Sequence, residues 1–178
     1  MSSQSIFLAA NLVGGCAVLG GYIACLTSYP QYGEALWGGV QGGLRNLFIG
    51  SMFLAASGYL VFCFYLIRLD GLSGDQGTPL HLWATILSAI FLMSAALWMP
   101  ATIGFIHQGY ILFWAVAITS LWITAGSLLV LTAMLALSSE LPTSLGRYLA
   151  ISGIAYISFH CLVLDALIWV GLFDRQNL

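Results

Sequence analysis

Five long apolar runs, separated by short polar stretches, limit what this chain can fold into more than any other feature. The runs lie near residues 5–28, 44–68, 81–106, 110–137 and 148–173. A helix of roughly 20 apolar residues crosses the hydrocarbon core of a bilayer, and each run reaches that length. The sequence therefore predicts an all-α fold, an integral membrane bundle of about five transmembrane helices.

The composition agrees with a chain that lies mostly in lipid. Charged residues make up 6% of the sequence and hydrophobic residues 61%, whereas a soluble domain carries roughly 25% charged residues. No polar stretch is long enough to fold alone, so we predict that residues 1–178 form a single transmembrane domain. The lipid bilayer is its expected partner. A nucleic-acid partner is not expected, because the basic residues form no cluster.

The chain has no lysine, and its four arginines stand at the edges of the apolar runs. Arg68 and Arg147 fall on the side of the N-terminus, and Arg45 and Arg175 fall on the opposite side. This even distribution favours neither orientation of a multi-pass protein, because orientation follows an asymmetry of positive charge. The first run is expected to be retained, since no Lys or Arg precedes it and it is too long for the core of a signal peptide.

Two of the connections between the runs stand out by composition. The first, YPQYGEALWGGVQGG at residues 29–43, is predicted to be either a mobile lid or a short interfacial helix around Glu34 to Trp37. The segment DGLSGDQGTP, residues 70–79, has the composition of a polar linker.

Local signals also mark helix boundaries and one irregularity. His107 to Gly109 predicts a tight turn, and Ser144 is a candidate N-cap for the last helix. Pro100 stands inside the third run, where it removes a backbone donor and predicts a kink. The kink can either line a cavity or only improve packing.

Small residues recur at helical spacing in three of the runs. They are Ala10, Gly14, Ala17 and Gly21 in the first, Ser51, Ala55 and Gly58 in the second, and Ala117, Ser120, Thr124 and Ser127 in the fourth. Such stripes let helix backbones approach closely in lipid. They predict a compact bundle, with a dimerisation seam as the alternative.

Asp165 is the most informative single residue, because it lies roughly 12 Å inside the end of the last run. A carboxylate at that depth should face the bundle interior, be neutral or be paired, so it is either a functional site or an interhelical hydrogen bond. His160, five residues away, is about 140° around an α-helix, so the two are not expected to share a face. Cys161 and Ser158 are expected on the face of Asp165, where they give no sign of nucleophilic catalysis.

The six tryptophans divide by expected depth. Three lie near the ends of the runs, where aromatic belts form without further function: Trp37, Trp83 and Trp169. Three are predicted to lie deeper, where they either pack the core or wall a flat apolar ligand: Trp98, Trp114 and Trp122.

The spacing of histidines, acidic residues and cysteines in the sequence does not indicate a metal or haem site. His107 lies at the end of the third run and His160 near the middle of the fifth, about 15 Å apart in depth, which defeats haem ligation by facing histidines. No Glu and His residues recur at metal-ligand spacing, and the four cysteines form no CxxC pair. Val61, Tyr65 and Arg68 fit a short sterol-binding pattern that apolar helices ending in arginine often produce by chance.

Two segments resemble the translocator protein family, also called tryptophan-rich sensory proteins. LWMPATIGFIHQGY, residues 97–110, is similar to that family's third-helix signature through Trp98, Pro100, Gly104, Gly109 and Tyr110. LDALIW, residues 164–169, is similar to its LN-x-x-x-W, with Asp165 in place of asparagine and Trp169 retained. Arg147 and the five-helix length also fit, whereas the first connection has only Pro30 where the family has a double proline.

The resemblance implies a bundle with a cavity that opens toward the first connection and binds tetrapyrroles, sterols or similar flat apolar ligands, usually in a homodimer. Residues Trp98, Pro100 and Asp165 would then line or shape the cavity. Together with the tryptophans, they form our candidate ligand-binding set: Trp98, Pro100, Trp114, Trp122, Asp165 and Trp37.

Two functions therefore compete. One is the binding or transport of a hydrophobic small molecule, for which a tetrapyrrole is the one cofactor class implied. The other is a non-catalytic accessory or structural subunit of a larger membrane complex. An enzyme comes third, because no pair of titratable groups is clearly placed on facing surfaces.

Overall fold

The computed structural model describes residues 2–70, 79–139 and 141–173, and it contains five long helices and no strand within them. The long helices are α1 (Ser3–Ser28), α2 (Gly42–Asp70), α3 (Pro79–Gln108), α4 (Ile111–Leu137) and α5 (Leu145–Phe159), the last continued by a π-helix (His160–Trp169) and α6 (Val170–Leu172). The five predicted spans are confirmed, and each is long and apolar enough to cross a membrane. The chain is a multi-pass integral membrane protein.

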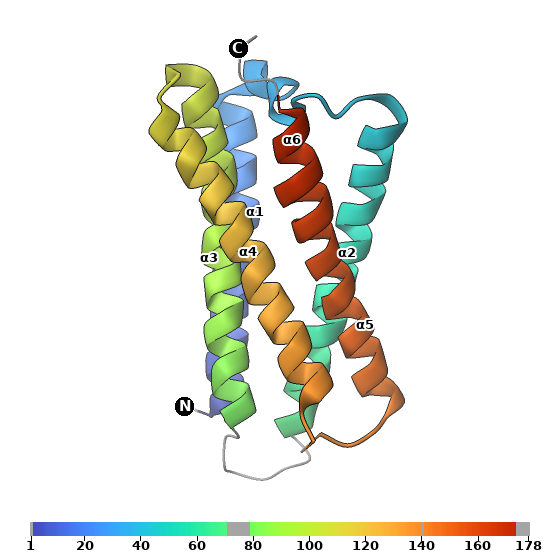
Figure 1. The fold of residues 1–178 in the computed structure, drawn as a ribbon. Helices are drawn as coiled ribbons and strands as arrows, with labels where there is room; N and C mark the ends of the chain where they lie inside the picture. Colours follow the sequence, from blue (N-terminus) through green and yellow to red (C-terminus); the bar gives the residue numbers. More distant parts are fainter. Residues whose placement is uncertain (1, 71–78, 140, 174–178) are drawn as a thin grey trace.

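The helices form a bundle in the order α1, α3, α4, α5 and α2 around its axis (Figure 1). The α1 helix packs mainly on α3, and α2 packs mainly on α5, so helices adjacent in sequence are not always adjacent in space. The α4 helix is the most enclosed of the five, whereas Phe7 is the one residue of α1 that is buried. The two ends of the chain lie at opposite ends of the bundle, as an odd number of spans requires.

Close approach of α2 and α5 depends on a pair of glycines. A Cβ atom added to Gly58 would lie 2.6 Å from the carbonyl oxygen of Gly153, and a Cβ on Gly153 would clash with the Gly58 carbonyl in turn. Gly14 of α1 is similarly tight, since its added Cβ would lie 2.7 Å from Leu92 of α3. The small residues predicted on α4 are all buried, so that stripe serves packing within the bundle.

Polar side chains satisfy the helix ends. Ser144 is the N-cap of α5, as predicted, and accepts a hydrogen bond of 3.2 Å from the backbone N–H of Arg147. The guanidinium of Arg147 donates to four backbone carbonyls at and just beyond the C-terminal end of α4: Leu135, Ala136, Ser138 and Leu141. These carbonyls have no partner within the helix, so one arginine closes the α4–α5 connection.

The turn between α3 and α4 is as short as the sequence predicts. Gly109 has φ +72°, a conformation that residues with a side chain rarely adopt, and α4 starts two residues later. Within α3, the helix continues through Pro100, whose side chain is exposed on the outer surface. The predicted polar linker at 70–79 falls mainly on residues 71–78, outside the described part of the chain.

Candidate functional site

The π-helix His160–Trp169 brings together His160 and Asp165, which we had predicted to lie on different faces of the last helix. His160 Nε2 lies 3.6 Å from Asp165 Oδ2. The prediction assumed α-helical winding, which is wrong here, because hydrogen bonds from residue i to residue i+5 place the fifth residue close to the first. His160 and Asp165 therefore form a pair.

His160 is also bonded to α2. Its Nδ1 lies 2.8 Å from Ser51 Oγ, and Ser51 Oγ lies 3.0 Å from the hydroxyl of Tyr156. Ser51 and His160 are both buried, so the network holds α2 against α5 inside the bundle. Ser51 was predicted only as a packing residue, and Tyr156 was not singled out, although its spacing of four from His160 indicates a shared face.

Asp165 lies beyond His160, away from Ser51 and Tyr156. Its side chain is 29% exposed although it lies about 10 Å from the end of the last span. The Cys161 thiol is its hydrogen-bonding neighbour, as the spacing of four predicted, and the Tyr22 hydroxyl of α1 lies close enough for electrostatic interaction. Ser158 instead faces α4, where its hydroxyl lies 2.9 Å from that of Thr132.

Aromatic rings fill the bundle next to Asp165. Trp98 of α3 makes edge contacts with Tyr22 and Trp169, with centroid distances of 5.9 Å and 5.3 Å. Trp169 and Phe173 then contact Trp114 of α4, whose ring stacks on Phe173 at 4.7 Å. Trp114 lies one turn from the start of α4 and extends the same aromatic cluster.

Loop 1, residues 29–41, covers this end of the bundle. It contains two short 3-10 helices, Pro30–Tyr32 and Ala35–Trp37, and the second confirms the short helix predicted near Glu34 to Trp37. The indole N–H of Trp169 donates to the Leu36 carbonyl at 2.9 Å, and the Gly39 N–H donates to the Leu172 carbonyl at 3.1 Å. Loop 1 is thus bonded to the end of the last span.

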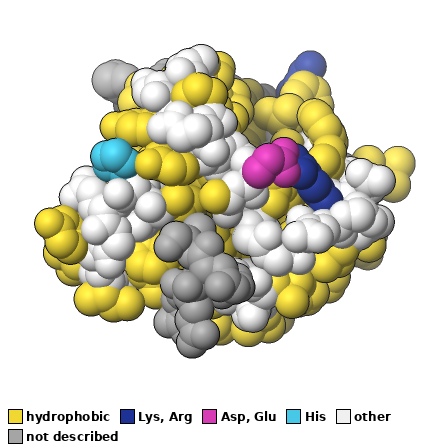
Figure 2. All heavy atoms as spheres, turned by 90° about the horizontal axis from the view of Figure 1, so that it is seen from above, with side chains coloured by type: hydrophobic (Ala, Val, Ile, Leu, Met, Phe, Trp, Pro, Cys, Tyr) yellow, Lys and Arg dark blue, Asp and Glu magenta, His cyan; other side chains and the backbone are white. Residues whose placement is uncertain are grey.

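An ion pair fixes the outer side of loop 1. The Arg45 guanidinium donates two hydrogen bonds to the Glu34 carboxylate, at 2.7 Å and 3.1 Å, and lies 4.6 Å from the centre of the Trp37 ring. These hydrogen bonds lower the pKa of Glu34. Figure 2 shows this end of the molecule, where an acidic side chain touches a basic one on a surface dominated by hydrophobic and uncharged atoms.

The remaining predicted residues do not join this cluster. The side chains of Pro100 and Trp122 face outward, the latter 47% exposed. Of the predicted sterol motif, Val61 and Arg68 are on the outer surface, whereas Tyr65 is buried and would contact a Cβ added at Gly146.

His107 has a different environment from His160. Its Nδ1 lies 2.8 Å from the hydroxyl of Tyr32 in loop 1, and Tyr29 packs beside both rings. The two histidines thus have separate partners at different depths. Within the described residues, no three His, Cys, Asp or Glu side chains gather as metal ligands would.

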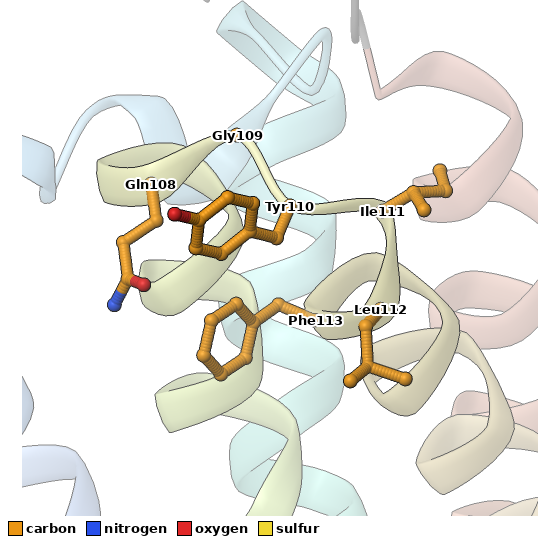
Figure 3. A pocket seen from close by; sticks show the side chains of 6 residues that line it. All are labelled: Gln108, Gly109, Tyr110, Ile111, Leu112 and Phe113. Carbon is orange, nitrogen blue, oxygen red and sulfur yellow. The ribbon is translucent and has the colours of Figure 1, made fainter.

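A hollow of about 680 Å³ lies at the turn between α3 and α4 (Figure 3). It is lined by consecutive residues, Gln108 to Phe113, with the rings of Tyr110 and Phe113 stacked at 6.5 Å. The hollow includes Tyr110 and Gly109 of the third-helix resemblance but no member of the Asp165 cluster. It is open to the surface and brings no titratable pair together.

Comparison with known proteins gives no relative for this chain. No family model, no curated protein and no solved structure matches it.

Proposed function

We propose that this membrane protein binds or transports a flat apolar small molecule, of the tetrapyrrole or sterol kind, beneath loop 1. The observation that carries the proposal is the Asp165 carboxylate, which is 29% exposed within a membrane span and interacts electrostatically with Tyr22, whose ring contacts Trp98. An accessible carboxylate at that depth can take a further polar partner besides His160 and Cys161, and flat rings can serve as an apolar wall. A ligand with an apolar body and one polar group supplies both.

The resemblance to the translocator protein family supports the same ligand class. Trp98 and Trp169 come from the two separate segments that carry the resemblance, and their rings are in contact at 5.3 Å. Gly104, a third matching position, is required by packing, because a Cβ there would lie 2.9 Å from the Phe113 ring. Membership of that family remains part of this proposal.

The proposed site has an inner and an outer layer. Trp98, Tyr22 and Asp165 form the inner layer, while Trp114 of α4 and Trp37 of loop 1 belong to the hydrophobic cluster that packs beside it. Pro100 and Trp122 stay outside the site, because their side chains face away from the bundle.

Ligand titration in lipid nanodiscs tests the proposal. Protoporphyrin IX and the fluorescent sterol dehydroergosterol are each titrated, and binding is followed through the fluorescence of the ligand itself. Trp98→Leu is expected to raise the Kd of the ligand that binds by about two- to thirteenfold, because an aromatic contact contributes about 0.5–1.5 kcal/mol beyond area burial.

Trp122→Leu is the matched control, since it removes the same side chain from an outward-facing position. It should leave the Kd unchanged. Failure of both ligands to bind, or an equal loss in the two variants, contradicts the proposed site.

The accessory-subunit function is favoured by one observation, the exposure of α1. In α1, only Phe7 is buried, so most of this helix is available to lipid or to another subunit. Gentle solubilisation from native membranes separates the two functions. A particle containing only this chain supports the ligand-binding protein, and stoichiometric co-purification of other subunits supports the accessory role.

A further inference from the structure

The hydrogen bonds around His160 allow an arrangement in which the imidazole turns an N–H toward Asp165. When the Ser51 hydroxyl donates to Nδ1 of a neutral His160 and accepts from Tyr156, the imidazole carries its hydrogen on Nε2. That N–H faces Oδ2 of Asp165 at 3.6 Å. In that arrangement the Nε2–H of His160 faces the carboxylate from just beyond hydrogen-bond distance, while the Cys161 thiol is the hydrogen-bonding neighbour of Asp165.

The described cations are all engaged elsewhere. Arg45 is paired with Glu34, Arg147 donates to the end of α4, and Arg68 lies over the ring of Phe64 at 4.9 Å. The sequence contains no lysine. Among the described residues, only neutral groups and the imidazole of His160 therefore surround Asp165, and an intramembrane carboxylate is stabilised by a counter-charge.

The rings beside Asp165 suit a cation as well as an apolar body. Tyr22 interacts electrostatically with Asp165, and the ring of Trp98 makes T-shaped contacts with the rings of Tyr22 and Trp169. Aromatic faces attract ammonium groups, most strongly when the site is shielded from water. A carboxylate beside tryptophan and tyrosine rings thus matches the two ends of a hydrophobic amine.

We propose that the ligand bound beside Asp165 is a flat apolar molecule whose polar group is an ammonium, held by the carboxylate next to the rings of Tyr22 and Trp98. This inference rests on the proposed function, because it names the ligand class of the same site. It also ranks the alternatives: a hydroxyl can still donate to Asp165, whereas a carboxylate on the ligand is repelled. The site should therefore prefer amines to alcohols, and alcohols to acids such as porphyrin carboxylates.

Three probes that share one ring system isolate the polar group. They are 9-(aminomethyl)anthracene, 9-anthracenemethanol and anthracene-9-carboxylate, titrated at neutral pH into the full chain in nanodiscs of uncharged lipid, with empty nanodiscs subtracted. The ammonium is expected to bind about tenfold or more tightly than the alcohol, because hydrogen bonds to charged groups are the strong ones. The carboxylate is expected to bind most weakly.

Asp165→Asn tests the residue itself, and Cys161→Ala is the control that alters a neighbour of Asp165 without removing the charge. Asp165→Asn should lower the affinity for the ammonium by about tenfold while changing the affinity for the alcohol much less. Cys161→Ala should keep the order of the three probes. The ranking in the unaltered protein is an independent readout should Asp165→Asn fail to fold.

The outcomes separate this inference from the proposed function. If neither protoporphyrin IX nor dehydroergosterol binds above empty nanodiscs, the proposed function fails, and the ammonium inference fails with it. The proposed site stands if the probes bind and Trp98→Leu weakens their binding. The ammonium inference is nevertheless overturned if the ammonium probe binds no more tightly than the alcohol, or if it keeps its higher affinity in Asp165→Asn.

Discussion

The contact between Gly58 and Gly153 gives the sharpest stability prediction. A Cβ on Gly58 would lie 2.6 Å from the Gly153 carbonyl oxygen and 2.8 Å from its Cα, against an ordinary contact of 3.4 Å or more. Both neighbouring atoms belong to the backbone, so no side chain can rotate away. Gly58→Ala must therefore push α2 and α5 apart by close to an ångström.

The cost follows from two opposing effects. Overpacking of a well-packed interior typically costs about 1–3 kcal/mol. Alanine is favoured over glycine in a helix by up to about 1 kcal/mol, which offsets part of that cost. We expect Gly58→Ala to lower the free energy of unfolding by about 1–2 kcal/mol.

Gly50→Ala is the matched control on the same helix. A Cβ at Gly50 meets nothing within 4 Å, so only the helix preference acts and the variant should be neutral or slightly stabilised. Unfolding by SDS in mixed micelles, followed by circular dichroism, measures both variants. If Gly58→Ala is as stable as Gly50→Ala, the close α2–α5 contact is refuted.

Three further predictions concern loop 1 and the α4–α5 connection. Trp169→Phe removes the N–H that binds the Leu36 carbonyl, so protease should cleave loop 1 faster, and the stability of loop 1 should fall by about 1 kcal/mol. Trp83→Phe, at an exposed position, should cause neither change. Arg45 lowers the pKa of Glu34, so the ion pair stabilises loop 1 at pH values above the ordinary pKa of Glu and is lost as the pH falls through the lowered pKa. Acid should therefore speed the cleavage of loop 1. In Glu34→Gln the cleavage should already be fast at neutral pH and should show no such acid step. Arg147→Met leaves four carbonyls without their donor and should lower thermal stability measurably, while Arg68→Met, at an exposed position over Phe64, should not. Each prediction has an outcome that contradicts it. These outcomes are, in turn, an unchanged cleavage rate in Trp169→Phe, an acid step that persists in Glu34→Gln, and equal stability of the two arginine variants.

Much of the fold could be predicted from the sequence, because the bilayer dictates the length and polarity of each span. The five helices, the turn at Gly109 and the cap at Ser144 follow from local patterns. The order of helices around the bundle does not follow from local patterns, since it depends on which faces fit together. The glycine contact shows this: Gly58 was visible as part of a stripe, but its partner Gly153 was not.

The candidate site was predictable only in part. Asp165 and Trp98 stood out because acids and deep tryptophans are unusual in apolar runs. The pairing of His160 with Asp165 depends on a π-helix, which changes the angular spacing of residues and leaves no simple signal in the sequence. The roles of Ser51 and Tyr22 depend on contacts between helices, so they required the three-dimensional structure.

Photolabelling tests the central claim, a flat apolar ligand held beneath loop 1, most directly. A cholesterol analogue carrying a ring diazirine is irradiated with the protein in nanodiscs, and the labelled residues are mapped by mass spectrometry. The account predicts label on the segments around Tyr22, Trp98 and Asp165, reduced by an excess of the unlabelled ligand. Label spread over outward-facing residues such as Trp122, with no reduction by competitor, would contradict it.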